Sequence, residues 1–65
     1  MMKTYARYKY TTGWEAKRIG SGWHEVTAEY TQYYPSGKHL TVVVNGLAVK
    51  ARHCELVQVF DKQAQ

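Results

Sequence analysis

The stretch that decides the fold runs Lys38-His39-Leu40-Thr41-Val42-Val43-Val44-Asn45-Gly46-Leu47-Ala48-Val49-Lys50-Ala51-Arg52. Two runs rich in β-branched and apolar residues, 38–44 and 47–52, flank the dipeptide Asn45-Gly46. Asn-Gly between such runs fits a two-residue type I′ turn, because both residues accept a positive φ angle. The segment therefore predicts a β-hairpin that turns at Asn45-Gly46.

The residues on both sides of this hairpin alternate with a period of two, which is typical of strands. Before it we expect strands over 3–11, 14–19 and 23–34, and the last is long enough to bend or bulge near its end. After it, residues 53–56 suit a single 3₁₀ turn, and a final strand follows over 57–60. The prediction is an all-β fold, a small barrel or sandwich of five or six antiparallel strands.

Length and composition limit the number of domains, the disulfides and the membrane segments that this chain can have. A chain of 65 residues forms one domain, spanning 1–65, with a small core. The single cysteine, Cys54, excludes an intramolecular disulfide. The apolar runs are too short to cross a membrane, and the first residues lack the apolar segment of a secretion signal. We therefore expect a cytoplasmic protein.

The aromatic residues are unusual, with six Tyr and two Trp against one Phe. Large rings fill small barrels well, and Tyr can keep its hydroxyl group in water. We therefore expect most of these rings in the core beside the aliphatic residues of the strands, and we expect Trp23 to be structural. The expected core comprises Tyr8, Tyr10, Trp14, Trp23, Tyr30, Leu40, Val42, Val44, Leu47, Val49, Leu56, Val57 and Phe60.

The order of strands and turns adds a further indication of the fold. Residues 22–30 begin with Gly-Trp and continue in polar–apolar alternation, and the turn over 34–38, the Asn45-Gly46 hairpin and the closing 55–57 follow. This pattern, over about residues 14–60, resembles the SH3-like barrels of the Tudor type. The resemblance implies a small binding module, since members of this fold bind peptides, methylated side chains, RNA or DNA.

The titratable residues do not form a catalytic pattern. Only Glu25 and Glu29 share a strand face among the carboxylates, and they lie ~13 Å apart along the strand, too far to act on one bond. His53 precedes Cys54 directly and would point elsewhere, so a thiol nucleophile lacks its base. No His or Cys pair has zinc-site spacing, and Gly20-Ser21-Gly22 lacks the Lys of a phosphate loop. We expect a non-enzymatic protein without a metal or cofactor.

Positive charge is concentrated at the start of the chain. The net charge is +4, and residues 1–20 account for all of it, with five Lys and Arg against Glu15 alone. Cations interleaved with an aromatic ring on one strand face are typical of single-stranded nucleic-acid sites. We predict that RNA or single-stranded DNA contacts Lys3, Tyr5, Arg7 and Lys9, extended by Lys17 and Arg18 of the adjoining strand. A solvated basic face, or an edge strand that lysines protect from aggregation, are the plainer interpretations.

A protein-interaction module is the alternative function. The alternating rings cannot all lie inside so small a domain, and exposed rings favour protein partners. Tyr33 and Tyr34 are the candidate interface residues, in a small viral or plasmid-encoded inhibitor or adaptor, or in a homo-oligomer. The two functions differ in salt response, because only phosphate contacts release counterions.

Overall fold

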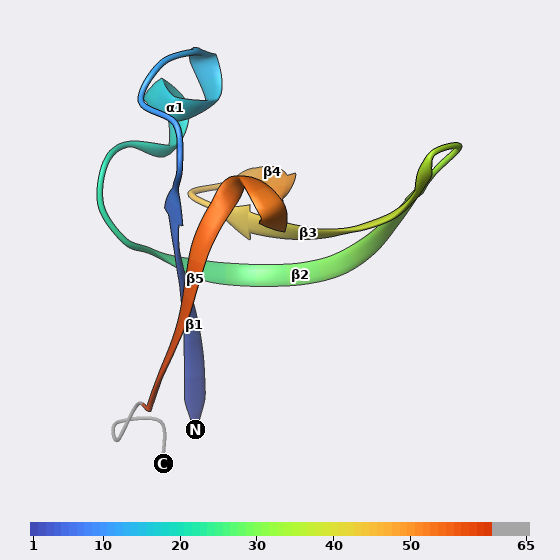
Figure 1. Cartoon of the computed structure of the whole chain (residues 1–65). Helices are drawn as coiled ribbons and strands as arrows, with labels where there is room; N and C mark the ends of the chain where they lie inside the picture. Colours follow the sequence, from blue (N-terminus) through green and yellow to red (C-terminus); the bar gives the residue numbers. More distant parts are fainter. Residues whose placement is uncertain (61–65) are drawn as a thin grey trace.

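A computed structural model describes residues 1–60 of the chain. These residues form five strands, one short helix and one 3₁₀ turn (Figure 1). The all-β prediction and the number of strands are confirmed, and the single 3₁₀ turn is present but lies over 51–53 rather than 53–56. The elements are β1 (Met2–Tyr8), α1 (Trp14–Ile19), β2 (His24–Tyr34), β3 (Gly37–Val44), β4 (Leu47–Lys50), η1 (Ala51–His53) and β5 (Cys54–Phe60).

The strands form one antiparallel sheet in the order β4-β3-β2-β1-β5. β4 and β5 are the outer strands of this order and do not pair with each other, so the sheet is open and the expected barrel is not closed. The segment that joins β4 to β5 explains why these two strands do not pair. β4 has four residues, and η1 then leads the chain back to β1, with which β5 pairs over its whole length from Cys54 to Phe60.

β2 gives the sheet its bend. Its first residues pair with β1 at Tyr5↔Glu25 and Ala6↔His24, and the rest of the strand pairs with β3. Figure 1 shows β2 curving away from β1 toward the β2–β3 hairpin. The predicted irregularity is present but lies between Val26 and Ala28, near the start of the strand rather than near its end. A bulge at this place increases the local twist where the strand changes partners.

The Asn45-Gly46 turn is confirmed. Asn45 has a φ of 53° and Gly46 a φ of 78°, as a type I′ turn requires. Among the described residues, Asn45 is the only one other than Gly with a positive φ. Its side chain also has a tertiary contact, because Nδ2 donates a hydrogen bond of 2.8 Å to the carbonyl oxygen of Ile19. The turn therefore holds the end of α1 against the hairpin.

The strand expected over 14–19 is wrong, because these residues form the helix α1. Glu15 lies in its first turn and Lys17 and Arg18 in its last, which suits the helix dipole, and Ala16 is a strong helix former. Ile19 is the one buried side chain of the helix, so a short helix suffices to anchor the segment. The Tyr8 hydroxyl donates a hydrogen bond of 2.6 Å to the Glu15 carboxylate.

The aromatic core is also wrong, because the buried core is aliphatic. Tyr10, Trp14, Trp23 and Tyr30 are exposed, and Tyr8 packs half-buried against the core. A tightly bent sheet of this size leaves room only for small side chains, and β-branched residues fill it. Leu40, Leu56, Val57 and Phe60 are likewise exposed rather than buried. The core consists of Ala6, Ile19, Val42, Val44, Val49 and Cys54.

The outline of the molecule is elongated, with principal extents of 40 × 26 × 17 Å. β1 and β5 run side by side as an arm, and the β2–β3 hairpin extends in a different direction (Figure 1). Within residues 1–60, no helix is long and apolar enough to cross a membrane.

Candidate nucleic-acid interface

The outward face of β1 carries three of the predicted site residues, and its two cations have acidic partners. Lys3 Nζ lies 3.8 Å from a carboxylate oxygen of Glu25. Arg7 Nε donates a hydrogen bond of 2.6 Å to Glu55, and its guanidinium carbon lies 4.7 Å from the ring centre of Trp23. Tyr5 sits between these two cations and is half-buried. The face is thus close to neutral, because a neighbouring strand supplies a carboxylate to each cation.

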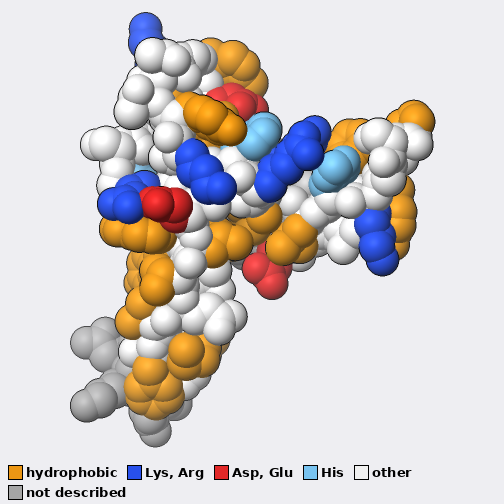
Figure 2. Space-filling view, viewed as in Figure 1, with side chains coloured by type: hydrophobic (Ala, Val, Ile, Leu, Met, Phe, Trp, Pro, Cys, Tyr) orange, Lys and Arg blue, Asp and Glu red, His pale blue; other side chains and the backbone are white. Residues whose placement is uncertain are grey.

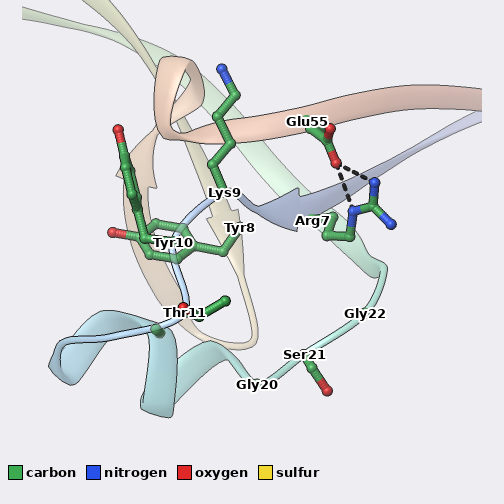
Figure 3. Close-up of a pocket in the computed structure, with 10 residues that line it drawn as sticks. Arg7, Tyr8, Lys9, Tyr10, Thr11, Gly20, Ser21, Gly22 and Glu55 are labelled. Atoms are coloured by element: carbon green, nitrogen blue, oxygen red, sulfur yellow. Dashed lines mark hydrogen bonds and ion pairs between the residues drawn. The ribbon is translucent and has the colours of Figure 1, made fainter.

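The other predicted cations lie elsewhere. Lys9 follows the end of β1, and Figure 3 shows its side chain pointing away from the Arg7–Glu55 pair. Lys17 and Arg18 are exposed on α1 and not on an adjoining strand, so they do not extend the β1 face. The six residues predicted as one patch therefore separate into a paired strand face, a loop cation and two helix cations.

A second group of cations and rings forms where β2, β3, β4 and η1 meet. The Tyr34 and His39 rings lie 5.3 Å apart between centres, and Lys50 Nζ lies 5.0 Å from the centre of the Tyr34 ring. The pairs Gln32↔His39 and Thr41↔Lys50 show that these side chains belong to one side of the sheet. We call Tyr34, His39, Lys50 and Arg52 the aromatic–basic face.

The segment after β1 continues this face. The Lys9 backbone N–H donates a hydrogen bond of 2.9 Å to the His53 carbonyl oxygen of η1. The Tyr10 ring then lies 5.5 Å from the His53 ring, edge to face. Figure 2 shows Lys, Arg and His side chains side by side across the middle of this view of the molecule. Lys9, Tyr10 and His53 thus extend the aromatic–basic face toward α1.

The electrostatics of this face differ from those of β1. Within residues 1–60, no carboxylate lies at ion-pair distance from Lys9, Lys50 or Arg52. Partial burial lowers the pKa of His39, and the positive charges of Arg52 and Lys50 lower it further. His39 is therefore a neutral ring at pH 7, while the two cations keep their charge available for an anion.

Two hollows adjoin these residues. One of about 200 Å³ lies on the aromatic–basic face and is lined by Tyr34, Lys50 and His53 together with Glu15 and Gln32. A larger one of about 500 Å³ lies between the end of β1 and the loop 20–22 (Figure 3). Both open beside cations and tyrosine rings, so each offers room next to groups that can stack or bind an anion.

The aromatic–basic face could not be predicted from the sequence, for a physical reason. Its residues come from three separate segments of the chain, and residues 21–65 have no net charge as a whole. The fold separates those charges, because Glu25 and Glu55 turn toward the β1 cations while Lys50 and Arg52 gather elsewhere. The basic tetrapeptide 50–53 and the ring-rich turn at 33–34 were the available signals.

Of the two tyrosines predicted at a protein interface, Tyr33 is 77% exposed, and Tyr34 belongs to the aromatic–basic face. They are neighbours on β2 and pair with Lys38 and Gly37, so they point to opposite sides of the sheet.

The single cysteine lies in the core beside Ala6. Its burial raises the pKa of the Cys54 thiol, so the thiol is protonated at neutral pH. The His53 ring packs instead against the Tyr8 and Tyr10 rings. Among residues 1–60, no group of three His, Cys, Asp or Glu side chains is placed to hold a metal ion.

The chain matches no protein-family model, no curated protein and no solved structure. The resemblance to SH3-like barrels therefore stays a prediction.

Proposed function

We propose that this protein binds single-stranded nucleic acid through the aromatic–basic face. One observation carries the proposal: Lys50 and Arg52 lie beside the Tyr34 and His39 rings, and no carboxylate of residues 1–60 pairs with either cation. Cations that follow the phosphates and rings that stack on bases are the two components of such sites.

The arrangement supports this function through two separate contributions. Tyr34 and the neutral His39 ring offer flat surfaces on which bases can stack, at ~1–3 kcal/mol per base. Lys50, Arg52 and Lys9 offer charges that can displace the counterions of the phosphates. Tyr34 and Arg52 are exposed, and His39 and Lys50 are half-buried. Because none of them lies in the core, the monomer loses little stability by keeping them at this junction.

The N-terminal strand has a smaller part in this proposal than its composition indicates. Lys3 and Arg7 would have to exchange Glu25 and Glu55 for phosphates, so binding there carries the cost of separating an ion pair. Lys9 is the residue of the predicted strand site that stays in the proposed one, because it lies beside η1.

The first test is a charge substitution with a matched control. The variant Lys9→Gln/Lys50→Gln/Arg52→Gln is compared with Lys17→Gln/Arg18→Gln/Lys38→Gln, which removes the same charge from α1 and the hairpin tip. Fluorescence anisotropy with labelled oligo(dT) and RNA is measured between about 50 and 200 mM salt. The first variant is expected to reduce the slope of log K against log salt by about 2, at ~0.7 per lost contact.

The control variant is expected to keep most of that slope. Equal losses in both variants would show general attraction by net charge and contradict the proposed site. A parent protein that binds neither oligonucleotide would contradict the function itself.

The second test separates stacking from charge. Tyr34→Ala is expected to weaken binding by ~1–3 kcal/mol and leave the salt slope unchanged, because a ring releases no counterions. Tyr33→Ala is the matched control, since it removes the neighbouring ring from the opposite side of the same strand. If Tyr33→Ala weakens binding as much as Tyr34→Ala, the bases do not stack on the aromatic–basic face.

A further inference from the structure

We propose that a second copy of this chain pairs with β5, so that the sheet continues through a two-fold axis into the second copy. The aromatic–basic face takes no part in this contact, so the proposal is independent of the proposed function. β5 is available because it is the last strand of the order and, among residues 1–60, has only β1 as a neighbouring strand.

The composition of β5 favours pairing with another strand, because β5 lacks the residues that protect an edge strand from such pairing. Its residues are Cys54-Glu55-Leu56-Val57-Gln58-Val59-Phe60, with one charge and no Lys, Arg, Pro or Gly. Edge strands that stay unpaired usually carry such residues, or are short or bulged. β5 pairs with β1 over seven consecutive positions without a register shift, so it presents a regular edge. β4, the opposite edge, has four residues and ends in Lys50.

An apolar strip accompanies this edge. The pairs Met2↔Phe60 and Ala6↔Leu56 place these four side chains on one face of the β1–β5 arm. Ala6 is buried in the core, but Leu56, Met2 and Phe60 are 43%, 52% and 56% exposed. β2 leaves β1 close to Ala6 and so does not cover the rest of the arm. Figure 2 shows hydrophobic side chains along the arm.

The strand is complementary to itself. An antiparallel pair of β5 strands centred on Val57 places Glu55 opposite Val59 of the second copy, and Cys54 opposite Phe60. The single charge of the strand therefore meets no like charge, and the apolar strips of the two copies lie on the same side. Two copies of one strand in this arrangement form a closed two-fold contact rather than a growing chain.

The monomer exposes more surface and is more extended than a compact domain of its size, as expected of a chain that pairs with a second copy. Its accessible surface is 4790 Å², whereas a compact monomer of 7.5 kDa exposes about 4,250 Å². The radius of gyration is 12.5 Å, against roughly 10.7 Å for a compact domain of 65 residues. The six hydrophobic residues buried within residues 1–60 also make a small core, and short chains commonly add stability by oligomerising.

The test measures mass against concentration, without nucleic acid. Sedimentation equilibrium or light scattering from about 1 to 200 µM is expected to show twice the monomer mass of 7.5 kDa at the upper end. Val57→Lys places two ammonium groups opposite each other on the axis and is expected to weaken dimerisation at least about tenfold. Ala48→Lys adds the same charge to β4, at the other edge, and is expected to leave the dimer unchanged.

A second measurement does not depend on the folding of a variant. Hydrogen exchange followed by NMR on the parent protein is expected to show concentration-dependent protection of the β5 amides that do not bond to β1. A parent that is monomeric at all concentrations, or whose outward β5 amides exchange rapidly throughout, would overturn the proposal. A dimer that Ala48→Lys disrupts and Val57→Lys leaves intact would overturn it as well, and would indicate the β4 edge.

Discussion

Substituting Asn45 tests how a turn residue joins the hairpin to the helix. Asn45 has two structural roles: it adopts a left-handed backbone conformation at φ 53°, and its Nδ2 donates a hydrogen bond of 2.8 Å to the Ile19 carbonyl oxygen. Ala removes both, because it has no side-chain donor and disfavours positive φ. Gly removes only the hydrogen bond, because it accepts this conformation freely.

The two variants should therefore differ by a measurable amount. Loss of the half-buried hydrogen bond costs about 1 kcal/mol. A left-handed Ala costs a further ~1–2 kcal/mol. We expect Asn45→Ala to lower the free energy of unfolding by about 2–3 kcal/mol and Asn45→Gly by about 1 kcal/mol. At ~4–8 °C per kcal/mol for a domain of this size, Asn45→Ala should lower Tm by roughly 8–24 °C.

The assay is urea unfolding followed by circular dichroism, at one fixed protein concentration for all three proteins. Equal stability of Asn45→Ala and Asn45→Gly would refute the argument from backbone conformation. An Asn45→Gly variant as stable as the parent would refute the contribution of the bond to Ile19. A larger loss in Asn45→Gly than in Asn45→Ala would contradict both parts of the reasoning.

Two further predictions concern polar groups inside the fold. Thr41 is buried, and its hydroxyl oxygen has no hydrogen-bond partner among the described residues. Thr41→Val should therefore raise the free energy of unfolding, measured by urea unfolding, by about 1 kcal/mol. A loss of stability would show that the hydroxyl is hydrogen-bonded. The hydrogen bond to Glu15, aided by burial, raises the pKa of Tyr8 to about 12 from 10.0. The folded state thus keeps a proton that the unfolded state loses above pH 10, and the resulting stabilisation, complete below pH 10, is lost between pH 10 and 12. Tyr8→Phe should be less stable than the parent at pH 9 and lose less stability between pH 9 and 11.5, and parallel pH profiles of the two proteins would contradict this assignment.

Local features of the chain were readable from the sequence, because they depend on neighbouring residues. Asn45-Gly46 and its flanking β-branched runs specify a hairpin through backbone preferences alone, and the structure has it at those residues. The period-two pattern likewise predicts the strands. Their ends shift by a few residues, since β1 ends at Tyr8 and the 3₁₀ turn precedes Cys54.

Other features depend on contacts between distant residues, and only the tertiary structure decided them. The Glu15–Arg18 run could have been strand or helix, and the burial of Ile19 against the hairpin made it helix. The bend of β2 decided that the core is aliphatic and the tryptophans are exposed. The tertiary structure also decided which charges are paired. Arg7 pairs with Glu55, which is 48 residues away, whereas Lys50 and Arg52 form no ion pair with a carboxylate of residues 1–60. Sequence alone determines which charges a chain carries, but their availability to a ligand depends on which carboxylates the fold brings beside them.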